Sequence, residues 1–263
     1  MKKNLVIIAA GAATLHLPWL KDTMRRFDVF TVDFSPDGTL KGKGEDFYLA
    51  QKGFKPQLIT AAIQQLGDNI YAYERIWLPD DDLFITATSI NRIFALAHKY
   101  KLDIGQPALN ADSYFSHKIT LQIPLIECHF TNFVEIMAPI IKTQRLLDYS
   151  DILREAKTGW GIDALWRKHC FERNYRMAII DSVPMVHTRP INVPKKGSTI
   201  ASGIYANSGD PNLEFQRLCE KHQIQKNTSN YIKGARLKHG IPIPAFMAKL
   251  MSSKSKRYKT AKK

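Results

Sequence analysis

Apolar and polar residues alternate along the chain with two periods, one typical of helices and one typical of strands. Residues 55–66 carry one apolar face at helical spacing, made of Leu58, Ile59, Ala62, Ile63 and Leu66. The same reasoning predicts strands at residues 5–10, 28–34, 71–78, 104–109, 118–124, 133–141 and 176–186, helices at 18–27, 55–66, 88–100, 144–156, 162–171 and 212–222, and a loop at 35–44. A strand-helix-strand start favours a parallel sheet, and the shorter runs after residue 100 favour a mixed one. The sequence therefore predicts a Rossmann-like α/β fold with a mixed central sheet flanked by helices.

The chain length of 263 residues suits one large α/β domain with an appendage. We expect residues 1–190, where strand and helix patterns alternate, to form the compact domain. Residues 191–248 are expected to form peripheral helices and loops, and residues 249–263 a flexible basic tail. The chain would then end in a helical, basic C-terminal extension.

The formal net charge of +14 is concentrated at the carboxyl end of the chain. Residues 221–263 contain 12 Lys or Arg and no Asp or Glu, which leaves +2 for residues 1–220. A nearly neutral main domain gives little electrostatic reason to bind nucleic acid, so we predict no specific nucleic-acid partner. For the basic tail two interpretations stay open: a solvated end, and peripheral contact with an anionic membrane.

Three widely spaced cysteines, Cys128, Cys170 and Cys219, argue against a disulfide framework and against a structural zinc site, and fit a reducing compartment. The N-terminus imitates a short signal peptide, because two lysines precede an apolar run. Residues 5–10 are equally typical of a buried first strand, and no stretch reaches the roughly 18 apolar residues of a membrane span. We expect a cytoplasmic protein that can meet the inner face of the membrane through its tail.

Three consecutive aspartates, Asp80, Asp81 and Asp82, follow Pro79 at the end of the aromatic run in residues 71–78. Because neighbouring carboxylates repel one another, they are best stabilised by a divalent cation such as Mg²⁺ or Mn²⁺. Such an ion keeps coordination positions for water and substrate phosphates, which favours nucleotide-diphosphate chemistry. A solvated turn or a helix N-terminus is the alternative. Placement at the carboxyl end of a strand, where α/β sheets bind ligands, favours the cation site.

The segment Trp77-Leu78-Pro79-Asp80-Asp81-Asp82-Leu83 resembles the aspartate motif of metal-dependent, nucleotide-sugar glycosyltransferases of the A-type fold. Four later blocks, at residues 104–109, 116–120, 133–139 and 159–163, are similar to successive blocks of an uncharacterised domain-of-unknown-function family. That family is known from plants and bacteria and is grouped with such glycosyltransferases. The resemblance extends over residues 5–187 and implies an A-type, nucleotide-sugar-transferase-like catalytic domain in residues 1–190. Because the family's own activity is unestablished, the fold transfers better than the function.

In such enzymes the aspartate motif contacts the ribose or donor sugar and the metal that bridges the diphosphate. The resemblance therefore implies that Asp80 and Asp82 bind the metal, and that Asp80 and Asp81 face the nucleotide-sugar. His187 ends a hydrophobic strand where these enzymes often have a metal-binding histidine, and Asp181 would be its hydrogen-bonding partner. The alternative for His187 is a strand-end histidine hydrogen-bonded to backbone.

Residues 159–163 resemble the glycine-tryptophan-glycine segment that precedes an acidic residue in several sugar transferases. The two glycines permit close backbone approach, and Trp160 offers an apolar platform to a bound sugar ring. Asp163 is either the general base for the acceptor hydroxyl or the cap of the helix that follows. Glu135 is the reserve catalytic candidate, because an unpaired carboxylate within the apolar residues 133–137 would be destabilising.

Residues 9–13 are small, but they lack the GxGxxG fingerprint and the P-loop lysine, so neither NAD nor ATP is indicated. They could still form the floor of a nucleotide pocket. Asp33 is placed at a strand end to bind a ribose or base, and Lys55 is placed to reach a phosphate. For both residues, surface or capping chemistry is the simpler alternative. Tyr71, Tyr73 and Trp77 alternate in strand register, and we expect core and lining residues there.

The residues and the resemblance together predict a metal-dependent glycosyltransferase acting in polysaccharide biosynthesis. Its partners would be a nucleotide-diphosphate sugar as donor and a hydroxyl of a carbohydrate or glycolipid as acceptor. Two alternatives stay open. A metal-dependent phosphodiesterase or nuclease would need a second set of metal ligands, which the sequence does not reveal. A non-catalytic carbohydrate-binding protein of the same fold would need none.

Overall fold

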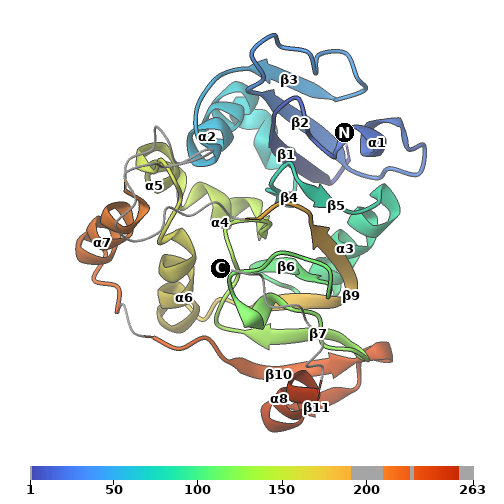
Figure 1. Cartoon of the computed structure of the whole chain (residues 1–263), viewed down its shortest axis with the longest axis vertical. Coiled ribbons are helices and arrows are strands. Elements are labelled where there is room, and N and C mark those ends of the chain that lie inside the picture. Colours follow the sequence, from blue (N-terminus) through green and yellow to red (C-terminus); the bar gives the residue numbers. More distant parts are fainter. Residues whose placement is uncertain (1, 191–209, 226–227, 255–263) are drawn as a thin grey trace.

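The computed structural model describes residues 2–190, 210–225 and 228–254, and a mixed sheet lies at their centre (Figure 1). The eleven strands of the sheet are β1 (Asn4–Ala10), β2 (Asp28–Asp33), β3 (Phe47–Ala50), β4 (Arg75–Trp77), β5 (Leu83–Phe84), β6 (Ile104–Leu109), β7 (Ile126–Thr131), β8 (Ile140–Lys142), β9 (Met177–His187), β10 (Ile232–Leu237) and β11 (Pro242–Pro244). The strand order is β11-β10-β7-β9-β6-β8-β4-β1-β2-β3, and β5, outside this order, pairs with β9.

The strands that point toward the acidic motif share one direction. β1 is parallel to β2 and β4, and β6 is parallel to β9. β8 is antiparallel to both β4 and β6, so these two strands also run the same way. The carboxyl ends of β1, β2, β4, β6 and β9 therefore lie at one edge of the sheet, which is where open α/β sheets bind ligands.

Helices cover both faces of the sheet, which explains why its first strand is buried on both sides. The helices are α1 (Leu17–Lys21), α2 (Lys55–Leu66), α3 (Ala87–Lys99), α4 (Thr143–Leu147), α5 (Ser150–Glu155), α6 (Ile162–Glu172), α7 (Pro211–Lys221) and α8 (Ala245–Lys254), with short 3-10 turns η1 (Gly67–Ala72), η2 (Lys118–Thr120) and η4 (Lys238–Gly240). Side chains of a strand alternate between its faces. Ile7 of β1 accordingly joins a core with α2, α5 and α6, whereas Ile8 joins a core with α1 and α3. The fold is thus a sheet between helical layers.

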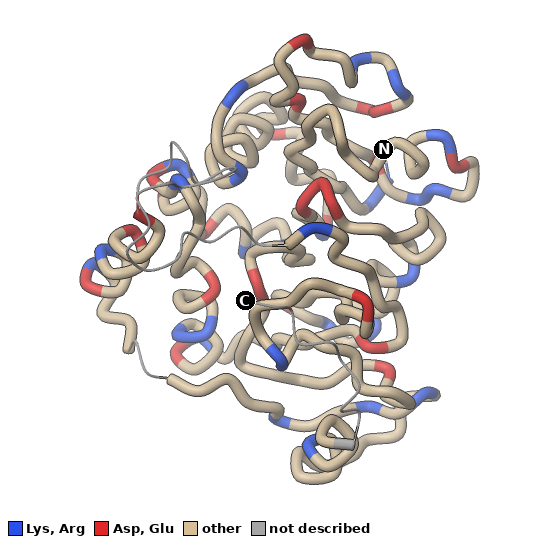
Figure 2. Tube along the Cα trace, viewed as in Figure 1, with Lys and Arg blue, Asp and Glu red and all other residues tan. Residues whose placement is uncertain are grey.

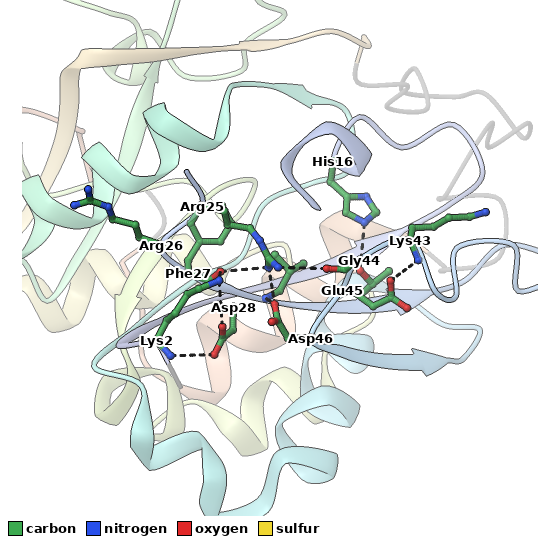
Figure 3. Close-up of polar contacts among 12 residues, drawn as sticks. Lys2, His16, Arg25, Arg26, Phe27, Asp28, Lys43, Gly44, Glu45 and Asp46 are labelled. Carbon is green, nitrogen blue, oxygen red and sulfur yellow. Dashed lines mark hydrogen bonds and ion pairs between the residues drawn. The ribbon is translucent and has the colours of Figure 1, made fainter. Parts of the chain in front are cut away.

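Ion pairs fasten the loops around β2 to the first residues of that strand (Figure 3). Lys2 Nζ lies 3.6 Å from Asp28 Oδ1, and Lys2 N donates a hydrogen bond of 3.2 Å to Asp28 Oδ2. Arg25 Nη1 lies 2.5 Å from Asp46 Oδ2, which also accepts a hydrogen bond from Val29 N. These contacts stabilise the amino end of β2, at the edge of the sheet opposite to the strand carboxyl ends.

Most elements of the first domain match the sequence prediction. The strands predicted at 5–10, 28–34, 104–109 and 176–186 are β1, β2, β6 and β9, and the helices predicted at 55–66, 88–100 and 162–171 are α2, α3 and α6. The helix predicted at 18–27 is wrong in extent, because α1 ends at Lys21. The segment after α1 leads to β2 without helical hydrogen bonds at these positions. Its backbone is bonded instead to the side chain of Asn91, which accepts from Arg26 N and donates to Met24 O.

The strand predicted at residues 71–78 is wrong in its first half. The 3-10 turn η1 extends to Ala72, and β4 begins only at Arg75. Tyr73 and Trp77 are buried as predicted, but Tyr71 is 65% exposed. The prediction for Tyr71 failed because strand alternation does not apply to a residue in a 3-10 turn.

The strands predicted at 118–124 and 133–141 are also largely wrong. η2 occupies the start of the first segment, and β8 begins only at Ile140 in the second. The true strand between them, β7, contains Glu127 and His129, which interrupt an apolar pattern. The single helix predicted at 144–156 is divided into α4 and α5 around Asp148 and Tyr149.

The C-terminal part contributes more to the sheet than the sequence indicated. The helix predicted at 212–222 is α7. β10 pairs with β7 and β11 pairs with β10, so residues 232–244 extend the sheet instead of forming only peripheral helices and loops. The predicted tail begins inside α8. Residues 191–209 and 255–263 of the predicted extension and tail lie outside the described residues.

Candidate functional site

The acidic motif forms the connection between β4 and β5 at the carboxyl edge of the sheet. Figure 2 shows the aspartates as one continuous acidic stretch between these two strands. The backbone of the segment is fixed by Asp80 N, which donates a hydrogen bond of 2.9 Å to Met137 O, and by Leu15 N, which donates one of 2.8 Å to Asp81 O. The motif is therefore held by the loops after β1 and before β8, and it is not a free solvated turn.

Asp80 faces the start of helix α2. Lys55 Nζ lies 2.5 Å from Asp80 Oδ1 and also donates hydrogen bonds to the carbonyl oxygens of Ile136 and Met137. Burial raises the pKa of Asp80; Lys55 opposes this shift, and repulsion from Asp82 adds to it. Lys55, predicted to reach a phosphate, thus lies directly beside the acidic motif.

Asp81 connects the first strand to the segment that follows β9. Gly11 N donates a hydrogen bond of 2.9 Å to Asp81 Oδ2, and Arg189 Nη1 lies 3.3 Å from Asp81 Oδ1. Arg189 also donates to the carbonyl oxygen of Ala13. A Cβ atom on Gly11 would come within 2.7 Å of the Phe34 ring, so only glycine lets this backbone approach so closely. Sequence reasoning missed Arg189, although it follows His187 by two residues.

Asp82 faces His187. His187 Nε2 lies 3.2 Å from Asp82 Oδ2, and Nδ1 lies 3.0 Å from the carbonyl oxygen of Tyr114. A carbonyl oxygen can only accept, so Nδ1 of the neutral ring carries the proton, and Nε2 can donate a hydrogen bond to Asp82 only after the ring gains a second proton. Burial lowers the pKa of His187, but the hydrogen bond and the negative charge of Asp82 raise it by more. The pKa of His187 therefore lies above its usual value.

The donor atoms of Asp82 and His187 fit a divalent cation. Asp82 Oδ1 is buried and has no hydrogen-bond partner among the described residues. A buried, unsatisfied carboxylate oxygen beside an imidazole lone pair is destabilising unless a proton or a cation lies there. Within the described ranges, no group of three or more His, Cys, Asp or Glu is close enough to hold a metal, so Asp80 would need to turn toward the pair to complete a set. The side chain of Asp80 is 38% exposed and is paired with Lys55.

Glu135 lies under the acidic motif. It belongs to the irregular segment before β8 instead of the predicted strand, and its backbone N donates a hydrogen bond of 2.6 Å to Gln106 Oε1. Its side chain is 7% exposed, and Oε2 has no hydrogen-bond partner among the described residues. Burial raises the pKa of Glu135 to about 8, assisted by repulsion from Asp163. Burial of Glu135 therefore favours its neutral, protonated form.

Asp163 lies in the first turn of α6, whose N-cap is Gly161. Asp163 Oδ1 accepts a hydrogen bond of 2.7 Å from Ala164 N, which agrees with the capping alternative. Burial raises the pKa of Asp163 to about 6, although this hydrogen bond and the charge of Arg167 oppose the shift. Asp163 is therefore mostly ionised at pH 7, unlike Glu135, and retains the charge that a general base requires.

The loop that carries Trp160 is held by helix α7, which lies later in the chain. The carboxylate of Glu214 accepts hydrogen bonds of 3.2, 2.9 and 3.0 Å from the backbone N–H groups of residues 157, 158 and 159. Gly161 has φ +100°, and a Cβ there would lie 2.8 Å from Leu218 Cδ2 of α7. Sequence reasoning missed Glu214, because its partners are backbone groups that leave no pattern in the sequence.

Two residues make contacts other than the predicted ones: Asp33, expected to bind a ribose or base, and Asp181, expected to hydrogen-bond to His187. Asp33 is 1% exposed, and its carboxylate accepts hydrogen bonds from Ser35 N, Leu40 N and Tyr48 Oη, so it holds the loop after β2. Asp181 does not contact His187 in the predicted way. It pairs with His129 at 2.8 Å, with both side chains fully buried. β7 runs antiparallel beside β9 at this point, so His129 of β7 lies next to Asp181. His187 lies six residues farther along β9.

Most of the predicted site residues are close together in the fold. The charges of Asp163 and Asp80 raise the pKa of Glu135 and those of His187 and Lys55 lower it, so all four groups lie within electrostatic range of this carboxyl group. They come from α2, the β4–β5 connection, the segment before β8, the start of α6 and the end of β9. The arrangement offers cation donors, a basic group, a neutral acid and an ionised carboxylate at one edge of the sheet.

Comparisons with known proteins support this architecture. A family model described as "Protein of unknown function (DUF707)" matches residues 66–234. No curated protein matches the chain. Among solved structures, S. aureus TarS 1-349 in complex with UDP-GlcNAc has a TM-score of 0.51 and 17% identity, over 84% of this chain and 65% of that one. A second structure of TarS 1-349 has a TM-score of 0.47 and 16% identity, over 70% of this chain and 59% of that one.

These matches span less than two thirds of the TarS chain, 59% and 65% of its length. At such low identity the likeness shows the fold alone. The predicted A-type glycosyltransferase fold is confirmed at this level.

Proposed function

The chain belongs to the DUF707 family, and from that premise, its fold and its site we propose that it is a glycosyltransferase that uses a nucleotide-diphosphate sugar as donor. One observation carries the proposal: at the carboxyl edge of the parallel strands the acidic motif contacts both His187 and Lys55, with Asp82 Oδ2 3.2 Å from His187 Nε2 and Asp80 Oδ1 2.5 Å from Lys55 Nζ. That edge is the general ligand site of α/β sheets. The complex of TarS with UDP-GlcNAc, a protein of like fold, supports the choice of donor class.

In this proposal Asp82 and His187 hold Mn²⁺ or Mg²⁺, and Asp80 completes the set. When bound, the ion would neutralise the charge that develops on the leaving nucleoside diphosphate. Lys55 and Arg189 supply positive charge on either side of the aspartates, where the phosphates of the donor would lie. Asp81 keeps the loop after β1 in place through Gly11, so that the small residues there form the pocket floor.

The remaining residues would act on the sugars. Asp163, ionised at pH 7, accepts the proton of the acceptor hydroxyl as its oxygen bonds to the anomeric carbon. The bond between the anomeric carbon and the diphosphate oxygen breaks in the same displacement. Glu135, neutral at pH 7, donates a hydrogen bond to a sugar oxygen, which an ionised carboxylate could not do. Trp160 packs against the apolar face of a sugar ring.

Nucleotide binding in the presence and absence of metal tests the donor and cation parts of the proposal. Isothermal titration calorimetry with uridine and guanosine diphosphates should detect binding that strengthens at least tenfold with Mn²⁺ in the wild type. Asp82→Ala should lose this metal-dependent gain, because it removes the carboxylate whose Oδ2 lies 3.2 Å from His187 Nε2. Metal-independent binding that the substitution leaves unchanged would contradict the proposed cation site.

Turnover can be tested without knowing the acceptor. Glycosyltransferases slowly pass the donor sugar to water, so release of nucleoside diphosphate from a panel of nucleotide-sugars should be measurable. We propose a carbohydrate or a glycolipid as the natural acceptor. Nucleotide-sugar binding without any hydrolysis or transfer across the panel would instead indicate a carbohydrate-binding protein of the same fold.

A further inference from the structure

Helix α8 exposes an apolar face at one end of the molecule. Phe246, Met247 and Leu250 are 70%, 43% and 55% exposed, and we call these three side chains the α8 apolar face. On the opposite side of the helix, Ala248 is fully buried in the small core beneath β10, and Met251, at the border between the two sides, is partly buried against the same core. Figure 1 places α8 with β10 and β11 at the end of the sheet away from β3. The helix is thus anchored by one side and bare on the other.

This exposure is concentrated in a way that single surface residues are not. Isolated exposed apolar side chains are normal in soluble proteins, whereas a group of them marks an interaction site. The α8 apolar face occupies positions i, i+1 and i+4, which share one side of a helix. Ile241, which directly precedes β11, is also exposed, at 57%. The α8 apolar face is therefore a candidate interaction site.

The charge around the α8 apolar face indicates what that partner is. The described segment 228–254, which contains β10, β11 and α8, has five Lys or Arg and no Asp or Glu. Lys249 is exposed one helical turn from Phe246, and Lys238 is exposed in η4. A second copy of this chain would bring like charges together across the contact, which is unfavourable. An anionic lipid surface offers negative phosphates to the lysines and an acyl layer to the apolar side chains.

We propose that the α8 apolar face inserts into the headgroup region of an anionic lipid bilayer. Within the described residues, no helix is long and apolar enough to cross a membrane, so α8 would lie in the plane of the surface. In this orientation Phe246, Met247 and Leu250 reach the acyl boundary while Lys249 stays at the level of the lipid phosphates. The inference rests on the exposure and charge of α8 and does not depend on sugar transfer.

Vesicle co-sedimentation of the full chain tests the proposal. Wild-type protein should sediment with vesicles that contain phosphatidylglycerol, and binding to pure phosphatidylcholine vesicles should be about tenfold weaker, because each basic residue near an anionic surface adds to the affinity. The double variant Phe246→Ser, Leu250→Ser should bind phosphatidylglycerol vesicles at least tenfold less than the wild type. Both side chains are exposed, so the fold should tolerate the change, and thermal unfolding checks this.

A matched control uses two exposed apolar residues far from α8. Met24 and Tyr71 are 58% and 65% exposed, and the double variant Met24→Ser, Tyr71→Ser should bind vesicles like the wild type. Three results would overturn the proposal: no vesicle binding by the wild type, equal binding by the two double variants, or a wild-type dimer that the α8 double variant converts to a monomer. The last would assign the α8 apolar face to contact between copies, and light scattering after gel filtration detects it.

Discussion

The imidazole Nε2 of His187 lies 3.2 Å from Asp82 Oδ2, and neither atom can donate a hydrogen bond to the other while the imidazole is neutral. The carbonyl oxygen of Tyr114 holds the proton of the ring on Nδ1. Two states resolve the conflict: the ring gains a second proton, or a cation lies between the two side chains. The unsatisfied Asp82 Oδ1 favours the cation, because a proton on His187 would leave that oxygen unpaired.

We therefore predict that Mn²⁺ binds this pair and that both residues are needed. His187→Gln and Asp82→Asn should each weaken Mn²⁺ binding by about 10- to 100-fold, since each removes one charged or lone-pair donor. The electron paramagnetic resonance signal of free Mn²⁺ measures the affinity directly. Asp112→Asn is the control, because Asp112 is an exposed carboxylate that precedes Tyr114 by two residues. If all three variants keep the wild-type affinity, the metal site is elsewhere.

Glu135 should make the protein less stable as the pH rises. Its pKa is raised in the folded state from 4.5 to about 8, so between these values the folded protein binds more protons than the unfolded chain. Its stabilising contribution is complete below pH 4.5 and is lost as the pH rises through 8. Glu135→Gln removes this dependence, and its stability relative to the wild type should rise by up to roughly 4 kcal/mol between pH 5 and pH 9. Urea unfolding at a series of pH values measures the difference.

Glu127 provides a contrast of opposite sign. Burial raises the pKa of Glu127, but hydrogen bonds from Lys99 and Tyr100 lower it by more. The pKa of Glu127 therefore lies below its usual value. Glu127→Gln should therefore be less stable than the wild type at pH 7, and the difference should shrink as the pH falls through the range where the carboxyl group is protonated. If the two glutamine variants instead follow the same pH trend, the environment assigned to Glu135 is incorrect.

Asp163 should control turnover without controlling donor binding. If it is the base, activity should rise with pH through its pKa of about 6 and level off above it, because only the ionised carboxylate accepts a proton. Asp163→Asn should lose turnover at least 100-fold and keep the wild-type donor affinity, since an amide can still accept the hydrogen bond of Ala164 N. An unchanged rate would return Asp163 to a capping role. Initial rates of nucleoside diphosphate release from pH 5 to 9 separate the two.

The nearness of Asp82 and His187 could be predicted from chain direction. Asp82 follows β4 and His187 ends β9, and strands of shared direction end at one edge of the sheet, so their meeting needs no knowledge of side-chain contacts. Glu135 was singled out because a carboxylate among apolar residues needs a reason to be there. Glu135 is buried, although the strand predicted around it is absent, and its catalytic role stays a prediction.

The contacts of other residues could not be predicted, because each of these residues could pair with any of several partners and the sequence does not say which one the fold brings close. Asp181 is close in sequence to His187, yet the register of β7 against β9 brings His129 beside it. Arg189 and Glu214 act mainly through backbone atoms of segments far away in the chain, and hydrogen bonds to backbone place no constraint on the partner's residue type. Local patterns are silent on such contacts.

Glu214 illustrates how such a contact can matter for the site. Its carboxylate accepts three backbone N–H groups of the loop that leads to Trp160, and its loss should free the loop. Glu214→Ala should lower the free energy of unfolding by about 2 kcal/mol, because the N–H groups lose a charged acceptor. Acrylamide should then quench tryptophan fluorescence more strongly, since Trp19, Trp77 and Trp166 are buried and Trp160 is partly exposed.

The conservative variant and a surface control distinguish loop positioning from a general loss of stability. Glu214→Gln keeps one carbonyl oxygen as acceptor and should recover part of both effects. Glu172→Ala removes a carboxylate of α6 whose contact with Lys168 is an exposed ion pair of 3.6 Å, so it should change neither. In transfer assays, Glu214→Ala should reduce kcat more than it raises the donor KM, because the loop carries Trp160 and leads into Asp163 while the nucleotide would lie at the aspartates. Equal quenching in all three variants and the wild type would show that α7 does not hold this loop.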